Sequence, residues 1–231
     1  MRSRHLATRK QWDGSMIKLA LNDGQRHHSI TCEAILFDMD GTLVDSTACV
    51  ESTWRTWATR HNLDIEKLLR VAHGRQNHQT IRLVAPHLET PEEIALLVRA
   101  EEECQDGIVA VPGALDFVDM LPLERWAVVT SAWRRLAKIR LECAGLPLPA
   151  VLITADEVKR SKPHPDGYLA AAASLGIEPA ECIVFEDAPA GIESALAAGM
   201  NVVGINTTFS RKELRCEWCI NDFQAISLIQ E

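Results

Sequence analysis

The sequence predicts an α/β fold, in which a parallel sheet lies between two layers of helices and a helical cap domain is inserted. Strands and helices alternate over the second half of the chain, which is typical of a parallel sheet covered by helices on both faces. In the first half of the chain, by contrast, one apolar run at 33–37 is followed by a long block, about 49–111, in which every segment has a helical pattern. The alternating apolar runs lie at 125–131, 151–154, 181–187 and 201–206.

The first strand is expected at 33–37, where EAILF is a short apolar run. The helical block after it carries three boundary signals. Ser46 is a candidate N-cap of its first helix, and Gly74 is a candidate C-cap residue of a later one. Thr90 with Glu93 three residues on predicts a capping box at the start of the last helix. The later helices are expected at 114–122, 133–145, 168–176 and 189–199.

We expect the chain to divide into three parts. Residues 1–30 are basic and polar, and we predict a flexible or loosely docked N-terminal extension there. The α/β core is expected at 31–48 and 112–231, and the helical cap at 49–111. Right-handed crossovers place the carboxyl ends of all strands at one edge, so the cap lies above the edge where open α/β sheets bind ligands.

Composition argues against several classes of protein. The chain has 24 basic and 32 acidic residues and a net charge of −8, which disfavours a nucleic-acid partner. No apolar run approaches the roughly 18–20 residues of a membrane helix, so no membrane partner is expected. Scattered cysteines without a secretion signal predict reduced thiols and a cytoplasmic protein. The pair Cys216 and Cys219 has no second ligand pair for zinc, and we interpret it as two partly buried thiols.

Polar residues stand at four predicted strand ends, which should converge on one edge of the sheet. Several carboxylates placed together would repel one another and raise each other's pKa values. A bound Mg²⁺, which prefers oxygen ligands, removes this conflict and is therefore the predicted cofactor. The residues concerned are Asp38, Asp40, Thr130, Ser131, Lys162, Glu186 and Asp187.

This set of groups predicts phosphoryl transfer. Asp38, at the end of its strand, is placed to attack phosphorus and to form an aspartyl phosphate. Asp40 would protonate the leaving alcohol and then take a proton from the hydrolytic water. Lys162 adds a cation, and Thr130 offers a hydroxyl near backbone N–H groups at a helix N-terminus, which suits an oxyanion.

Four motifs in this order and spacing resemble the haloacid dehalogenase-like hydrolase superfamily, over about 33–208. They are DMDGT, VVTSA, KPHPDGY and VFEDAPAGIESALAAGM. The chain is most similar to the helical-cap subgroup of β-phosphoglucomutase-like phosphatases. The resemblance implies a three-layer, Rossmann-like core and an enzyme that hydrolyses phosphoric monoesters. The dehalogenases of the superfamily lack the second aspartate, so Asp40 argues against dehalogenation.

The resemblance also implies roles for individual residues. Asp38 is the nucleophile and Asp40 the general acid/base, while Thr130 and Lys162 hold the phosphoryl group. Ser131 and Ala132 are expected to bind the substrate beside them. The implied Mg²⁺ ligands, with Glu186 acting directly or through water, are Asp38, the Asp40 carbonyl, Asp187 and Glu186.

Several segments resemble bacterial sugar phosphatases that act on hexitol and 2-deoxyhexose phosphates. These are AHGRQ in the cap and AVVTSA, AGLP, EVKRSKPHPDGYL and EDAPAG in the core. The resemblance implies a small phosphorylated sugar or polyol as substrate, and a monomer. His73, Arg75 and Gln76 in the cap are candidates for contacts with substrate hydroxyls, the alternative being a solvated polar turn. Trp54 and Trp57, three residues apart, are expected in the cap core.

Two alternatives to a phosphatase stay open from the sequence. A phosphomutase of the same fold would return the phosphoryl group to a sugar instead of to water, and the motifs do not separate the two. A phospho-acceptor receiver module also places aspartates, a hydroxyl and a lysine around Mg²⁺. The helical insert and Asp40, which is placed to hydrolyse the adduct, argue against a receiver.

Overall fold

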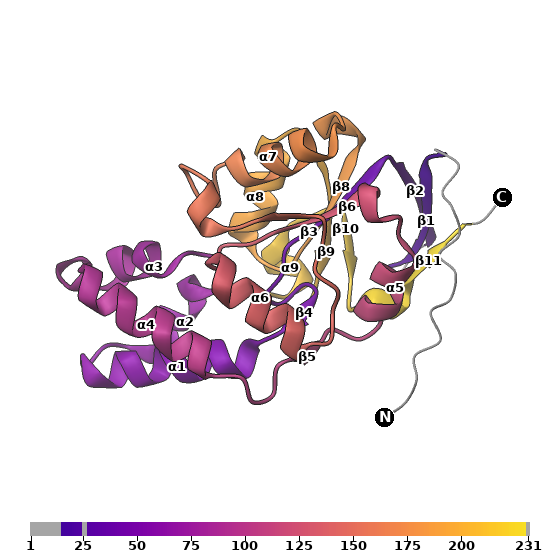
Figure 1. Cartoon of the computed structure of the whole chain (residues 1–231). Helices are drawn as coiled ribbons and strands as arrows, with labels where there is room; N and C mark the ends of the chain where they lie inside the picture. Colours follow the sequence, from indigo (N-terminus) through magenta and orange to yellow (C-terminus); the bar gives the residue numbers. More distant parts are fainter. Residues whose placement is uncertain (1–14, 25–26, 230–231) are drawn as a thin grey trace, which may run out of the picture.

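The computed structural model describes residues 15–24 and 27–229 (Figure 1). Its centre is a sheet of six strands in the order β10-β9-β8-β3-β6-β7, and all neighbours are parallel. This confirms the predicted α/β class, with β3 in the interior of the sheet. The strands are β3 (Ala34–Phe37), β6 (Trp126–Val129), β7 (Val151–Ile153), β8 (Cys182–Glu186), β9 (Asn201–Ile205) and β10 (Trp218–Ile220).

Helices cover both faces of this sheet, as Figure 1 shows. Successive side chains of β3 alternate between the faces, because strand side chains have a period of two. Ile35 and Phe37 pack with residues of α5 and α6, whereas Ala34 and Leu36 pack with residues of α7, α8 and α9. The helices are α5 (Ala114–Met120), α6 (Arg134–Cys143), α7 (Asp166–Leu175), α8 (Pro189–Ala197) and α9 (Arg211–Leu214).

Four further helices lie together beside the core, and we call residues 47–103 the cap (Figure 1). They share an apolar cluster of their own, in which Trp54 and Trp57 pack edge to face with ring centroids 5.6 Å apart. The expectation that these tryptophans form the cap core is confirmed, while the domain limits of 49–111 stay a prediction. The helices are α1 (Thr47–Arg60), α2 (Ile65–Ala72), α3 (Asn77–Val84) and α4 (Pro91–Glu103).

The predicted helix boundaries hold only in part. Thr90 caps α4 by accepting a hydrogen bond from the Glu93 N–H at 3.3 Å. The Glu93 carboxylate does not complete a capping box, since it accepts a hydrogen bond from Trp57 Nε1 at 2.7 Å. Ser46 precedes α1 but makes no capping bond, because its hydroxyl donates to Asp40.

Two strands and a disulfide join the ends of the cap. β4 (Val44–Asp45) pairs antiparallel with β5 (Val109–Ala110). Cys49, near the start of the cap, and Cys104, directly after its end, form a disulfide with their Cα atoms 5.6 Å apart. The prediction of reduced thiols is therefore wrong for this pair, because the return of the chain brings together two cysteines that are 55 residues apart.

The N-terminal segment contributes a second, antiparallel sheet in the order β11-β1-β2. Ile17, Leu19 and Leu21 alternate along β1 and are at most 1 % exposed, because they pack into the core on the α5 side of the main sheet. The predicted flexible or loosely docked extension at 1–30 is therefore wrong for 15–24 and 27–30, and residues 1–14 lie outside the described part. The strands are β1 (Ile17–Asn22), β2 (His27–Cys32) and β11 (Ile226–Leu228).

Short 3₁₀ turns complete the structure: η1 (Pro86–Leu88), η2 (Leu123–Arg125), η3 (Ala155–Glu157), η4 (Pro179–Glu181) and η5 (Phe223–Ala225). Among the described residues, no helix has the length and apolar character needed to cross a membrane.

The burial of β1 makes a test of the N-terminal sheet possible. Leu19→Ala is expected to lower the free energy of unfolding by about 2–5 kcal/mol, because it leaves a cavity in the core. The matched variant Leu83→Ala, at a side chain that is 59 % exposed, should change it by less than ~0.5 kcal/mol. Urea denaturation measures both. Equal stability of the two variants would contradict the docking of β1.

Candidate active site

The site begins where β3 ends at Asp38, a residue that is only 3 % exposed. The Asp38 N–H donates to the Phe185 carbonyl of β8 at 3.0 Å, which fixes this strand end against its neighbour. The chain then turns at Gly41, which has a φ of +83°. A Cβ there would lie 2.0 Å from Asp187 Oδ2, so only glycine lets the turn approach that carboxylate.

Lys162 brings a positive charge to this strand end. Its Nζ atom donates to Asp38 Oδ1, to Glu186 Oε1 at 2.7 Å and to the Val129 carbonyl at 3.2 Å. Burial alone would lower the pKa of the Lys162 ammonium, but the charges of Asp38 and Glu186 outweigh this effect and raise it. Lys162 is therefore a fixed ammonium group within the site.

Glu186 is fully buried and is engaged on both carboxylate oxygens. In addition to Lys162, the Tyr168 hydroxyl donates to Oε1 at 3.0 Å and the Ala188 N–H donates to Oε2 at 3.0 Å. A Cβ at Gly191 would lie 1.5 Å from Oε1, so the N-terminal turn of α8 leaves room for this carboxylate. Glu186 therefore holds Lys162 in place.

Three carboxylates meet here in the described part of the chain. Asp38, Glu186 and Asp187 each offer an oxygen atom, and these atoms lie within 4.8 Å of one another. Burial raises the pKa of the Asp38 carboxyl to about 7, although Lys162 acts in the opposite direction. Burial, followed by the charge of Asp38, raises the pKa of the Asp187 carboxyl well above its usual value. Such crowding of oxygen donors fits a hard divalent cation, whose charge would favour the ionised carboxylates.

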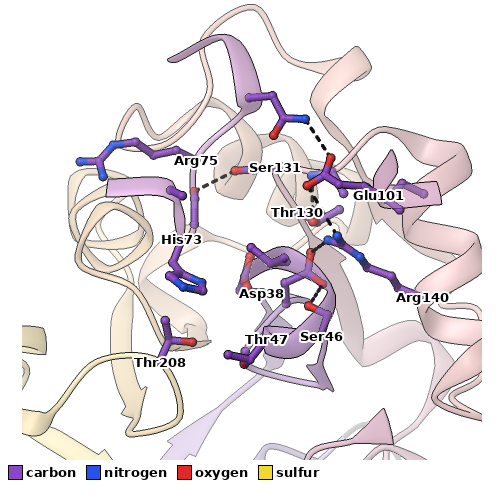
Figure 2. Close-up of a pocket in the computed structure, with 18 of the residues that line it drawn as sticks. Asp38, Ser46, Thr47, His73, Arg75, Glu101, Thr130, Ser131, Arg140 and Thr208 are labelled. Atoms are coloured by element: carbon purple, nitrogen blue, oxygen red, sulfur yellow. Dashed lines mark hydrogen bonds and ion pairs between the residues drawn. The ribbon is translucent and has the colours of Figure 1, made fainter. Parts of the chain in front are cut away.

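Asp40 points into the same cavity from the loop after β3, with a quarter of its side chain exposed. Ser46 Oγ donates to its Oδ1 at 2.6 Å, and Arg140 Nη1 donates to its Oδ2 (Figure 2). Arg140 was not among the residues predicted from the sequence. The sequence feature that could have identified Arg140 is its position on α6, four residues after Leu136 and next to Leu141, on the buried face of the helix.

The loop after β6 carries Thr130, Ser131 and Ala132, which all line the cavity. Thr130 Oγ1 accepts a hydrogen bond from the Ala132 N–H at 3.1 Å, and its own proton can still be donated. Ser131 Oγ donates to the Gly74 carbonyl of the cap at 3.0 Å (Figure 2). Ser131 therefore links the core loop to the cap.

The three predicted cap residues occupy different places. His73 lines the cavity, and burial lowers the pKa of its imidazole. Arg75 also lines it, but its guanidinium donates to the Val71 carbonyl at 3.1 Å and extends away from Asp38 (Figure 2). Gln76 lines a smaller neighbouring cavity and precedes α3, where its N–H donates to Gln79 Oε1 at 3.4 Å.

The main cavity lies between core and cap and contains about 680 Å³ of empty space that is partly open to solvent. Both parts of the chain supply its lining. Besides Arg140, the lining contains polar residues that the sequence did not indicate as site residues, and these are Ser46, Thr47, Asn77, Glu101 and Thr208. They lie on elements whose relative positions depend on how the cap packs on the core.

Comparison with known proteins agrees with this architecture. The family model of haloacid dehalogenase-like hydrolases matches residues 32–199. Hexitol phosphatase A of Escherichia coli (strain K12) is 45 % identical over 180 residues, which covers 76 % of this chain and 83 % of that protein. Glycerol-1-phosphate phosphohydrolase 1 of Saccharomyces cerevisiae is 34 % identical over 213 residues, covering 86 % and 85 %.

Solved structures show the same likeness. The crystal structure of a hydrolase from Pseudomonas syringae superposes with a TM-score of 0.75 at 27 % identity, covering 83 % of this chain and 94 % of that one. The family model spans the strand end at Asp38, the cap and the strand end at Asp187. This chain therefore belongs to the haloacid dehalogenase-like hydrolase family.

Proposed function

We propose that this protein is a Mg²⁺-dependent phosphatase of small phosphorylated sugars or polyols that acts through an aspartyl phosphate on Asp38. The main support is the buried group formed by the Asp38 carboxylate, the Lys162 ammonium and the Asp187 carboxylate, of which Asp38 lines the main cavity. The names of the relatives, a hexitol phosphatase and a glycerol-1-phosphate phosphohydrolase, support the substrate class.

Asp38 is the nucleophile of the proposed mechanism. A carboxylate oxygen of Asp38 forms a bond to phosphorus while the bond from phosphorus to the ester oxygen breaks. The ammonium of Lys162, already bound to Asp38, offsets negative charge on the transferring phosphoryl group. The Thr130 hydroxyl, which lines the same cavity, donates to a phosphoryl oxygen.

Asp40 transfers protons in both half-reactions. In protonated form it donates its proton to the leaving alkoxide, which departs as the alcohol. A water molecule then attacks phosphorus of the aspartyl phosphate, and Asp40 takes a proton from that water. Inorganic phosphate leaves and the Asp38 carboxylate is restored. Ser46 and Arg140, bonded to the two oxygens of Asp40, orient this carboxyl toward the cavity.

Asp38, Asp187 and the backbone carbonyl of Asp40 are the proposed Mg²⁺ ligands. Within the described residues, Lys162 is ion-paired with Asp38 and Glu186 but not with Asp187. The carboxylate of Asp187 is therefore able to bind a further cation. The bound ion would supply positive charge against the phosphate and the crowded carboxylates. Both oxygens of Glu186 already accept hydrogen bonds. We therefore propose that Glu186 affects the metal ion indirectly, by holding Lys162 and through a bridging water molecule.

The cap covers the reacting groups. His73 and Gly74 from the cap line the cavity that contains Asp38. Closure of the cap excludes bulk water while the aspartyl phosphate forms, and opening admits the hydrolytic water and releases the products. The contact of Ser131 with Gly74 stabilises the closed position.

Replacement of the nucleophile is the first test. Asp38→Asn should lower phosphate release from a hexitol phosphate at least about 1,000-fold, because an amide cannot form the aspartyl phosphate. The measurement is inorganic phosphate release with Mg²⁺ over a panel of phosphorylated hexitols, hexoses and trioses. Asp116→Asn, at an exposed aspartate of α5, is the matched control and should keep wild-type rates.

Two outcomes of this panel would contradict the proposal. Wild-type rates in Asp38→Asn would exclude the nucleophile. Formation of an isomeric sugar phosphate without phosphate release would identify a phosphomutase.

The metal requirement is a second test. A chelator should abolish phosphate release, and added Mg²⁺ should restore it. Asp187→Asn should raise the Mg²⁺ concentration for half-maximal rate about tenfold or more, since the site loses one carboxylate. Asp116→Asn again serves as the control and should keep the wild-type Mg²⁺ dependence. Full activity after chelation, with metal content checked by elemental analysis, would show that no metal takes part.

A further inference from the structure

A polar cluster at the junction of cap and core has only one member, Arg140, with a part in the proposed mechanism. It consists of Asn77 on α3, Glu101 on α4 and Arg140 on α6, and all three residues line the main cavity. Asn77 Nδ2 donates to Glu101 Oε2 at 2.8 Å, and Arg140 Nη2 lies 3.7 Å from Glu101 Oε1. In Figure 2 Glu101 and Arg140 lie across the drawn site from His73 and Thr208.

Arg140 has hydrogen-bonding capacity that its surroundings leave unused. The side chain is 3 % exposed, and only its Nη1 atom donates to a carboxylate, that of Asp40. Its Nε and Nη2 atoms are buried without a hydrogen-bond partner among the described residues. The 3.7 Å between Nη2 and Glu101 Oε1 exceeds hydrogen-bond length, so this ion pair does not satisfy Nη2. Buried donors without partners are costly, which points to an acceptor supplied by a ligand.

The spacing of Arg140 and Glu101 selects the chemistry of that ligand. The separation of 3.7 Å is less than the sum of two hydrogen bonds of about 2.8–2.9 Å, so one oxygen atom held between the two groups would bond to both Nη2 and Oε1. Because Nη2 is buried in this structure, that oxygen would have to enter before the cap is seated. An alcohol accepts a hydrogen bond from the guanidinium and donates one to the carboxylate. A phosphate or carboxylate oxygen only accepts, and the charge of Glu101 would repel it.

We propose that Asn77, Glu101 and Arg140 form the subsite that binds a hydroxyl group of the leaving alcohol. This inference rests on the proposed phosphatase function and deepens it, since the subsite would favour polyol and sugar phosphates over plain alkyl phosphates. Arg140 also bonds to Asp40, so a hydroxyl bound there is aligned with the group that protonates the leaving oxygen. Two of the three residues belong to the cap, and the subsite is therefore complete only when the cap is seated on the core.

A purely structural cluster that fastens the cap to the core would have different effects. Loss of such a fastening would lower kcat/KM for all phosphate esters alike, because the cavity would be equally disturbed for each of them. Loss of a hydroxyl subsite lowers kcat/KM for esters that carry the hydroxyl and changes the selectivity. The ratio of kcat/KM for a hexitol phosphate to that for n-butyl phosphate separates these cases.

The experiment measures this ratio in the full-length protein with Mg²⁺. Glu101→Ala is expected to lower the ratio about 10- to 100-fold, mainly through the KM of the hexitol phosphate, because a charged hydrogen-bond partner is lost. Glu103→Ala, two residues on in the same helix with a side chain that is 65 % exposed, is the matched control and should keep the wild-type ratio. Thermal unfolding of each variant checks that it is folded, and Asn77→Ala provides a second, milder variant.

Each outcome decides the inference. A fall of the ratio in Glu101→Ala and a smaller fall in Asn77→Ala support it. An unchanged ratio, or equal loss for both esters, overturns the subsite while leaving the phosphatase proposal intact. A wild-type protein that releases no phosphate from any polyol or sugar phosphate overturns the proposed function and the subsite together.

Discussion

The ion pairs of Lys162 with Asp38 and Glu186 are the interaction on which the rest of the site depends. All three side chains are at most 5 % exposed, so each charge needs its partner inside the protein. Asp38 and Glu186 stand at the ends of neighbouring parallel strands, β3 and β8, and Lys162 reaches them from the loop after β7. Tyr168 and the turn into α8 then hold Glu186. The sheet, the lysine loop and two helices are therefore tied to one buried charge arrangement.

Arg140 connects this core arrangement to the cap. It reaches Asp40 in the core and Glu101 in the cap from a helix that itself packs against the sheet. The apolar clusters of core and cap are separate, and polar contacts such as that of Ser131 with Gly74 join the two parts. Polar contacts at a cavity that is partly open to solvent can be replaced by contacts with water at low cost. In the proposed mechanism, a cap held in this way moves over the strand ends of the core.

The strand ends were predictable from the sequence, because parallel topology sends every strand's carboxyl end to one edge. Asp38, Lys162 and Asp187 met there as expected. Other features depend on non-local packing. β1 pairs with β11 near the opposite end of the chain, and no pattern within the first 30 residues indicates this pairing. The bond of Arg140 to Asp40 spans 100 residues and depends on how α6 packs, which the local helical pattern does not specify.

The two ends of the cap lie close together in space. Cys49 and Cys104 have Cα atoms 5.6 Å apart, and β4 and β5 run side by side just outside them. A segment whose ends nearly touch can be lengthened, shortened or exchanged without moving the strands that it interrupts. The chain is in this sense modular: recombination or protein engineering could graft a different cap between Asp45 and Val109 and keep the same phosphoryl-transfer groups. New substrate ranges can thus arise without rebuilding the charged centre of the core.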